Sequence, residues 1–486
     1  MFHRAVMTAV LCLAAFATHA ELPAPVAEKL AQANISQDGI GSIVVRLSDG
    51  ATLLSHNADM SLQPASTMKL VSTIIGLDTL GPMFRGRTLL QSDAQIRSGR
   101  LMGDLVLRGG ADVDLNWQAL QGMLQTLRDR GIKHIHGDLL IDRSLYQPAR
   151  LDLGVAPFDE GPEFRYNAIP DALGLNLNLL QLELSADHKA LSVHMLPALE
   201  RVSVTHDMTL IDAACKDWDN GWLPPTIERQ RGTIRIVLHG TYPRGCTKAT
   251  EINVLDRTDY AERLFRALWK QLGGSFKGQV REASTAASMT ILAEHKSRAL
   301  AEVLRDINKQ SDNTYARLLM LNIGTYAVDN AIAGNLSLRA AEPANTLQRA
   351  EREMRSWLRG HDIDDAGLVL DNGSGLSRSE RIKPVQMAAL LKVAQQGIWA
   401  PEVMASLPLA GMDGTMRSRL KDSPAAGRAR IKTGGLNNVV AAAGYVLDAQ
   451  GRLCIVVGMI NASPMKGSEG RAALDSLIDW VARSGN

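Results

Sequence analysis

The sequence predicts a multi-domain α/β protein in which a β-rich region interrupts a domain built from strands and helices. The chain has 486 residues, whereas single domains usually run to roughly 100–200 residues. The stretch 84–285 consists of short strand-like segments separated by Gly, Asp and Asn turns, and a helical pattern resumes over 299–323. We therefore expect 21–83 and 286–486 to form one discontinuous domain, and 84–285 to form an inserted region of two small β-rich domains.

Flanking the inserted region, the sequence pattern predicts the individual elements. Residues 42–47 and 51–55 are apolar and β-branched around an Asp-Gly turn, which is typical of a hairpin. A helix is expected over 67–80, directly after this hairpin. Two strands are expected within 443–460, and a final helix over 471–483 places its apolar residues on one face.

The composition excludes several classes of protein. Hydrophobic residues make up 45% and charged residues 21%, which excludes a mainly disordered chain, a collagen and a polytopic membrane protein. The 53 basic and 51 acidic residues nearly cancel, so nothing favours a nucleic-acid partner or an anionic membrane. After the N-terminal segment, no stretch is long and apolar enough to form an integral membrane segment.

The first twenty residues have the pattern of a secretory signal peptide. Arg4 is followed by an apolar stretch over 5–17, and a small residue, Ala20, suits cleavage. Cys12 offers lipidation as an alternative, which the bulky Leu11 before it disfavours. We expect the chain to be exported and cleaved near Ala20.

Export determines how the cysteines are interpreted. An oxidising compartment favours bridged over free cysteines, and Cys215 and Cys246 lie in polar, turn-rich sequence, so we pair them. Cys454 lies in an apolar strand pattern, where cysteine packs as a small hydrophobe. The alternative is that all three are free.

Serine and lysine motifs are the candidates for chemistry. Ser-x-x-Lys occurs at Ser66, Ser418 and Ser463, whereas Lys-Thr-Gly occurs once, at Lys432. Ser418 and Ser463 lie in sequence that does not favour a helix holding the pair. Ser66 begins a predicted helix, where free backbone N–H groups favour developing negative charge, and Lys69 follows one turn later as a possible base. The alternative is that Ser66 only caps the helix and that Lys69 is solvated.

In order, these motifs resemble the triple signature of the penicilloyl serine transferases. The three elements are Ser66-Thr67-Met68-Lys69, Ser311-Asp312-Asn313 and Lys432-Thr433-Gly434. The resemblance implies a penicillin-binding or serine β-lactamase-like catalytic domain, an antiparallel sheet flanked by helices plus a helical lobe, with the motifs meeting in the cleft between them. More than two hundred residues separate the first two motifs, which is similar to the low-molecular-mass class C penicillin-binding proteins of the D-alanyl-D-alanine carboxypeptidase/endopeptidase type, whose extra domains are inserted there.

The resemblance also implies catalytic roles. Ser66 would be the nucleophile and Lys69 its base, with the pKa of Lys69 lowered by burial and by Lys432. Ser311 would pass a proton towards the leaving amine, and Asn313 would hold the substrate amide and the Lys69 head group.

Further residues are implied in substrate binding. Lys432 and Thr433 suit a terminal carboxylate, Gly434 would let the substrate lie close to an edge strand, and the backbone N–H groups of Ser66 and Gly435 would form the oxyanion hole. Gly435 stands where the family often has Ser or Thr, so a hydroxyl for the carboxylate is missing. Two less specific residues complete the set: Arg378 could compensate for this loss, and Asp142 either reaches towards the cleft or is a turn residue at a strand end.

The function implied by the resemblance is a periplasmic serine DD-peptidase. It would hydrolyse the D-Ala-D-Ala bond of peptidoglycan stem peptides through an acyl-enzyme, act on D-alanyl cross-links as well, and bind β-lactams covalently. No cofactor or metal is implied, and His134 and His136 suit a solvated strand face better than a metal site. A β-lactamase and a non-catalytic wall-binding protein on the same fold are the alternatives. The sequence does not determine the oligomeric state.

Overall fold

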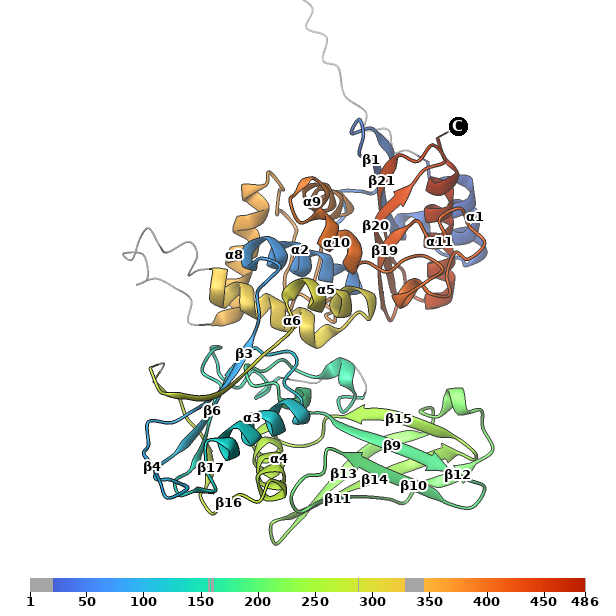
Figure 1. The fold of residues 1–486 in the computed structure, drawn as a ribbon. Helices are drawn as coiled ribbons and strands as arrows, with labels where there is room; N and C mark the ends of the chain where they lie inside the picture. The colour runs from blue at the N-terminus through green and yellow to red at the C-terminus, as the bar shows by residue number, and fades with distance from the viewer. Residues whose placement is uncertain (1–20, 156–157, 159–160, 287, 328–344, 486) are drawn as a thin grey trace, which may run out of the picture.

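The structure is a computed structural model that describes residues 21–155, 158, 161–286, 288–327 and 345–485. The predicted signal peptide, 1–20, lies outside the described residues. Figure 1 shows two bodies, one formed by both ends of the chain and the other by its middle.

The first body is built around a five-stranded antiparallel sheet that joins the two ends of the chain. Its strand order is β19-β20-β21-β1-β2. The bounds are Ile40–Arg46 for β1, Thr52–His56 for β2, Arg430–Leu436 for β19, Val439–Leu447 for β20 and Leu453–Asn461 for β21. The hairpin and the C-terminal strand pair predicted from sequence are both present, and β1 pairs with β21 from Ile40↔Ile460 to Arg46↔Cys454.

Helices cover both faces of this sheet. On one side lie α1 (Ala24–Gln32) and α11 (Gly467–Arg483), on the other α9 (Pro384–Gln396) and the helical lobe (Figure 1). The lobe contains α2 (Lys69–Leu80), α5 (Leu300–Lys309), α6 (Asn313–Asn322) with its π-turn Ile323–Ala327, α8 (Thr346–Gly360) and α10 (Ala400–Ser406). Because apolar layers cover both faces, β20 and β21 are buried almost throughout, as continuous apolar strands require. This is the predicted fold: an antiparallel sheet flanked by helices, plus a helical lobe.

Among its described residues, the second body contains four sheets and two α-helices, α3 (Trp117–Asp129) and α4 (Arg257–Gln271). The sheet orders are β17-β8-β6-β3-β18, β16-β7-β5-β4, β10-β9-β15 and β11-β14-β12, with β13 also paired to β14. The strands are β3 (Arg87–Gln91), β4 (Ile96–Arg97), β5 (Arg100–Leu101), β6 (Leu105–Gly110), β7 (His134–Ile135), β8 (Leu139–Asp142), β9 (Leu180–Ala186), β10 (Leu191–Leu196), β11 (Val202–His206), β12 (Thr209–Ile211), β13 (Trp222–Gln230), β14 (Thr233–Pro243), β15 (Thr247–Ile252), β16 (Ser275–Phe276), β17 (Val280–Glu282) and β18 (Ile291–Lys296). We keep 84–285 as the proposed inserted region, with β18 completing one of its sheets from beyond that boundary.

Short 3-10 turns connect several of these elements. They are Gln37–Gly39, Ala65–Met68, Arg165–Asn167, Leu175–Asn178, Cys215–Asp217 and Gly414–Met416. Within the described residues, no helix combines the length and apolar character needed to cross a membrane.

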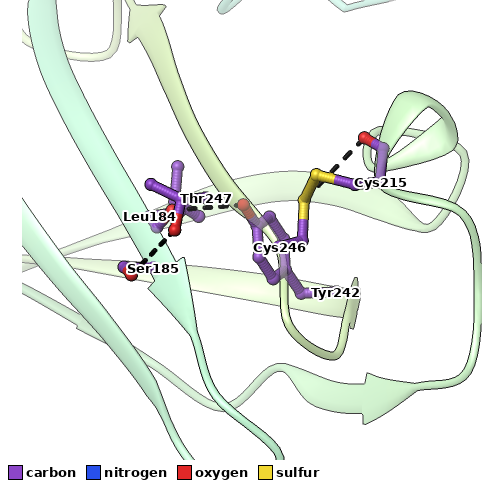
Figure 2. Close-up of a disulfide and its surroundings, with 6 residues drawn as sticks. All are labelled: Leu184, Ser185, Cys215, Tyr242, Cys246 and Thr247. Atoms are coloured by element: carbon purple, nitrogen blue, oxygen red, sulfur yellow. Dashed lines mark hydrogen bonds between the residues drawn. A yellow bond between two sulfur atoms is a disulfide. The ribbon is translucent and has the colours of Figure 1, made fainter.

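The predicted disulfide between Cys215 and Cys246 is present (Figure 2). It ties the turn at 215–217 to the start of β15, beside the buried Tyr242, whose hydroxyl donates to the Leu184 carbonyl of β9 at 3.2 Å. Cys454 is a buried free thiol in β21, as its strand pattern indicated.

Replacing both bridged cysteines by serine is expected to destabilise the protein. Because the disulfide closes a loop across a sequence separation of 31, its loss should lower the free energy of unfolding by about 3 to 4 kcal/mol in the loop-entropy account. Urea unfolding of the double variant would measure this loss. Substituting the buried Cys454 by alanine is the control, and an equal or greater loss there would contradict the assignment.

Candidate active site

Ser66 lies on a tight turn that leads into α2. The turn spans Ala65–Met68, and Ala65 has a positive φ of 44°. Two glycines allow neighbouring segments to pack against it: a Cβ at Gly375 would lie 1.8 Å from the Ala65 carbonyl oxygen, and one at Gly434 would lie 2.8 Å from the Ser66 nitrogen. The turn is therefore clamped between β19 and the loop that contains Gly375. Glycine was predicted at position 434 because a substrate would approach it closely. The structure adds a second reason: a side chain there would collide with the backbone of Ser66.

Lys69 is fully buried, and its ammonium group is surrounded by oxygen atoms. Nζ donates to Ser66 Oγ at 2.9 Å, to Asn313 Oδ1 at 2.6 Å and to the Ser374 carbonyl at 2.5 Å. Burial lowers the pKa of Lys69 to about 7. The alternative of a solvated lysine beside a capping serine does not describe this geometry.

Charges around Lys69 adjust this pKa in both directions. Asp312 and Glu380 favour the protonated form and raise the pKa, whereas the Arg317 guanidinium lowers it. Burial has the largest effect. The result is an amine that can release or accept a proton near neutral pH.

Ser311 and Lys432 form a second hydroxyl–amine pair. Ser311 lies between α5 and α6 and has a positive φ of 61°, which interrupts the helical backbone. The next residue, Asp312, caps α6 by accepting a hydrogen bond from the Tyr315 N–H. Lys432 Nζ donates to Ser311 Oγ at 2.9 Å and to the Thr433 carbonyl at 2.8 Å. Burial, and then the charge of Lys69, lower the pKa of Lys432 well below its usual value.

The side chains of Lys69 and Lys432 are fully buried, whereas the uncharged residues around them are partly accessible to solvent. Ser66, Ser311, Asn313 and Thr433 are all half-buried, and Gly435 is exposed. A substrate would meet hydroxyls, an amide and an edge strand, with the amines one layer deeper.

Strand β19 forms one wall of the site and is an edge strand of the sheet. Thr433 Oγ1 donates to Thr415 Oγ1 at 2.7 Å, and the loop bearing Thr415 is held by an ion pair between Lys309 and Asp413. In the part of the chain that the structure describes, no atom apart from those of the flanking residues lies within 4 Å of a Cβ built at Gly435, so the backbone here has room for a Cβ.

Arg378 lies at the rim of the site. Its guanidinium donates to the Asn437 carbonyl, just past the end of β19, at 3.3 Å, and lies 5.4 Å from the centre of the Phe158 ring. It is exposed, so its position suits contact with the end of a bound ligand.

Asp142 lies elsewhere, and its turn interpretation fits the structure better. It is fully buried at the end of β8, with its oxygens accepting hydrogen bonds from the backbone and hydroxyl of both Ser144 and Thr285. These four donors satisfy the carboxylate and outweigh the effect of burial, so they lower its pKa. These two residues and the Arg108 guanidinium, 3.8 Å from Asp142 Oδ2, surround the carboxylate at the end of β8 and keep it there.

Glu380 was not among the site residues predicted from the sequence. It is 1% exposed, and burial raises its pKa. Its carboxylate accepts hydrogen bonds from the backbone N–H groups of residues 371, 372, 373 and 375, at 3.3, 3.0, 2.7 and 2.8 Å. It thereby shapes the loop whose Ser374 carbonyl accepts from Lys69.

The inserted region also reaches the site. Asn313 Nδ2 donates to the Tyr166 carbonyl at 3.0 Å, and Arg165 bridges Asp312 and Glu251 at 3.1 and 2.7 Å. The Ser311-Asp312-Asn313 motif belongs to the first body, and these hydrogen bonds fix it to the second body as well.

A serine that is hydrogen-bonded to a buried lysine, between a helical lobe and an antiparallel sheet, defines the penicillin-recognising class of serine enzymes. The chain belongs to the D-Ala-D-Ala carboxypeptidase 3 (S13) family, whose model matches residues 22–481.

Relatives span nearly the whole chain. It is similar to the D-alanyl-D-alanine carboxypeptidase DacB of Haemophilus influenzae, at 26% identity over 448 residues, 91% of this chain and 89% of the relative. It is similar to a D-alanyl-D-alanine carboxypeptidase of an Actinomadura species, at 29% identity over 435 residues, 86% of this chain and 77% of the relative. The fold is similar to the crystal structure of penicillin binding protein 4 (dacB) from Haemophilus influenzae, with a TM-score of 0.77 at 23% identity, covering 94% of this chain and 99% of that one.

Proposed function

We propose that this protein hydrolyses the D-Ala-D-Ala bond of peptidoglycan stem peptides through an acyl-enzyme on Ser66. The observation that carries the proposal is the buried Lys69 amine 2.9 Å from Ser66 Oγ, with a pKa of about 7. Membership of the S13 family supports the reaction, and the two carboxypeptidase relatives support the substrate class.

In the acylation step, neutral Lys69 removes the proton from Ser66 Oγ as this oxygen attacks the carbonyl between the two D-alanines. The backbone N–H groups of Ser66 and Gly435 stabilise the oxyanion. As the C–N bond breaks, Ser311 gives its proton to the leaving amine and is reprotonated from Lys432, its hydrogen-bond donor. Lys69 next passes the proton taken from Ser66 to solvent, and Lys432 takes one back, so both amines regain their starting state. In deacylation, Lys69 accepts a proton from a water molecule as this water attacks the acyl carbonyl, and returns the proton to Ser66 Oγ as the ester C–O bond breaks.

The terminal carboxylate of the substrate would lie at the end of the cleft formed by β19. Thr433 offers a hydroxyl and Lys432 a positive charge in its protonated form, while Arg378 at the rim offers a permanent one. Because Gly435 contributes no hydroxyl, we expect Arg378 to carry a larger share of carboxylate binding.

We further propose that the protein acts in the periplasm after cleavage near Ala20, and that β-lactams acylate Ser66. Cleavage of D-alanyl cross-links uses the same chemistry, with a longer leaving amine that belongs to a second stem peptide.

Labelled penicillin followed over time tests the proposal. We expect a stable adduct on the wild-type chain that is absent from Ser66→Ala, together with release of D-alanine from a pentapeptide. Rapid turnover of the adduct would indicate a β-lactamase, and absence of any adduct would indicate a non-catalytic wall-binding protein. Loss of cross-linked dimers, measured in parallel, compares endopeptidase with carboxypeptidase action.

The acylation rate should depend on pH through Lys69. Its pKa is lowered to about 7, and only the neutral amine can accept a proton, so the rate should rise with pH and reach half its plateau near pH 7. Stopped-flow acylation by a chromogenic β-lactam from pH 5 to 9 would measure this. In Arg317→Gln the midpoint should move upward, because Arg317 lowers the pKa of Lys69. A wild-type profile that is flat down to pH 5.5 would contradict the assignment.

A further inference from the structure

A groove leads away from the active site along the inserted region. One open pocket, about 740 Å³, begins at Ser311 and Asn313 and is bounded by β15 and the turns at 164–166 and 218–219. A second pocket, about 260 Å³, continues to the start of α3. The two share Arg165, Gln181 and Glu251, so they form one continuous surface, which we call the side groove.

Aromatic side chains are concentrated along this groove, although they make up only 4% of the chain. Trp218 lines its wall and packs edge-on against Trp222 at a centroid distance of 5.8 Å, and against Tyr242 at 6.3 Å. The disulfide anchors the turn just before Trp218. Trp117 lies at the far end of the groove. The indole of Trp218 is thus held rigidly in place, which lowers the entropy lost when a ligand stacks on it.

Glutamine side chains supply the polar groups. Gln118, Gln181 and Gln310 all line the side groove and are exposed. None of the three side chains forms a hydrogen bond with another residue in the described part of the chain. Each therefore offers a free amide donor and acceptor to a ligand.

The charge of the groove argues against an acidic ligand. Its lining includes four carboxylates, from Asp114, Asp219, Glu251 and Asp312, and one guanidinium, from Arg165. An anionic peptide strand would meet like charge here. An uncharged ligand rich in hydroxyl and acetamido groups would meet aromatic faces and free amides without that repulsion.

We propose that the side groove binds the N-acetylated sugar strand to which the stem peptide is attached. This inference rests on the proposed function and adds a second recognition element to it: the peptide enters at Ser66, while the sugars lie against Trp218 and Gln181. The groove then favours glycan-linked peptides over free peptides of the same sequence.

A pair of matched substrates tests this proposal: a pentapeptide joined to its N-acetylglucosaminyl–N-acetylmuramyl disaccharide, and the same pentapeptide without sugar. In Trp218→Ala, kcat/KM for the sugar-linked substrate should fall by about tenfold, the size of one lost aromatic stacking contact. Gln181→Ala should reduce it by a smaller factor. Neither variant should change turnover of the free pentapeptide or acylation by penicillin. Gln125→Ala, an exposed glutamine on α3 outside the groove, is the control and should change none of them.

The outcomes separate this inference from the proposed function. If wild-type protein processes the free pentapeptide but gains nothing from the disaccharide, the sugar site is wrong and the peptidase assignment stands. If Trp218→Ala and Gln181→Ala impair a sugar-free cross-linked peptide dimer instead, the groove holds a second peptide. Titration of triacetylchitotriose into Ser66→Ala protein adds a direct measurement: saturable heat that Trp218→Ala abolishes supports the sugar site, and no heat overturns it.

Discussion

Lys69→Met is expected to slow acylation of Ser66 by about 10²–10⁴-fold, the usual contribution of a general base. Methionine has a similar length and is apolar, so it can fill the buried space that Lys69 occupies in the wild type. What disappears is the only amine bonded to Ser66 Oγ among the described residues. The measurement is the second-order rate constant for acylation by a β-lactam, together with a near-ultraviolet circular dichroism spectrum to show retained packing.

The matched control for this experiment is Lys392→Met. Lys392 is exposed on α9, so the same substitution there should leave acylation unchanged. A Lys69→Met variant that acylates within tenfold of wild type would require another base, and the proton path given above would be wrong.

Glu380→Ala should reduce both stability and acylation. The substitution leaves four backbone N–H groups, two buried and two part-buried, without their acceptor, so the free energy of unfolding should fall by about 3 kcal/mol or more. Acylation should fall because the loop also positions the Ser374 carbonyl that accepts from Lys69. Glu380→Gln should lose less, because its carbonyl oxygen can still accept the three N–H groups that Oε1 accepts in the wild type.

Urea unfolding and acylation kinetics, measured on the same preparations, would test this order. Glu469→Ala serves as the control: its carboxylate is 36% exposed and forms an i,i+3 pair on α11, so it should change stability by less than about 0.5 kcal/mol. Equal effects of the alanine and glutamine variants at Glu380 would show that charge, not the set of acceptor bonds, is what the loop needs.

The sequence was informative wherever function depends on local spacing. Ser66 and Lys69 are three residues apart, and one helical turn brings such residues to the same face. Lys432-Thr433-Gly434 lies on the edge strand β19, and the strand pair that follows it was predicted from apolar runs on either side of the turn at 448–451. The hairpin, the two C-terminal strands and the last helix were predicted for the same reason.

The remaining features depend on contacts that no local pattern records. The Ser374 carbonyl that accepts from Lys69 is a backbone group, which every residue has, so no residue type indicates it. Glu380 is buried, but nothing in the neighbouring sequence distinguishes it from a glutamate on the surface. Asp142 shows the converse: an aspartate at a strand end was equally compatible with a cleft position until Thr285, distant in sequence, supplied two of its donors.

The pairing of β1 with β21 has a consequence for the order in which the molecule assembles. Ile40 of β1 pairs with Ile460 of β21. Because β1 belongs to the hairpin that precedes Ser66, this hairpin cannot pair with β21 until nearly the whole chain has been synthesised. Contacts this distant in sequence form late, because closing a long loop costs entropy before any contact repays it. The middle of the chain, with its local sheets and a disulfide across a separation of only 31, can fold first. Ser66 and Lys69 would then meet Lys432 only at the final step, so a chain truncated before β19 would have a folded middle and no reactive serine.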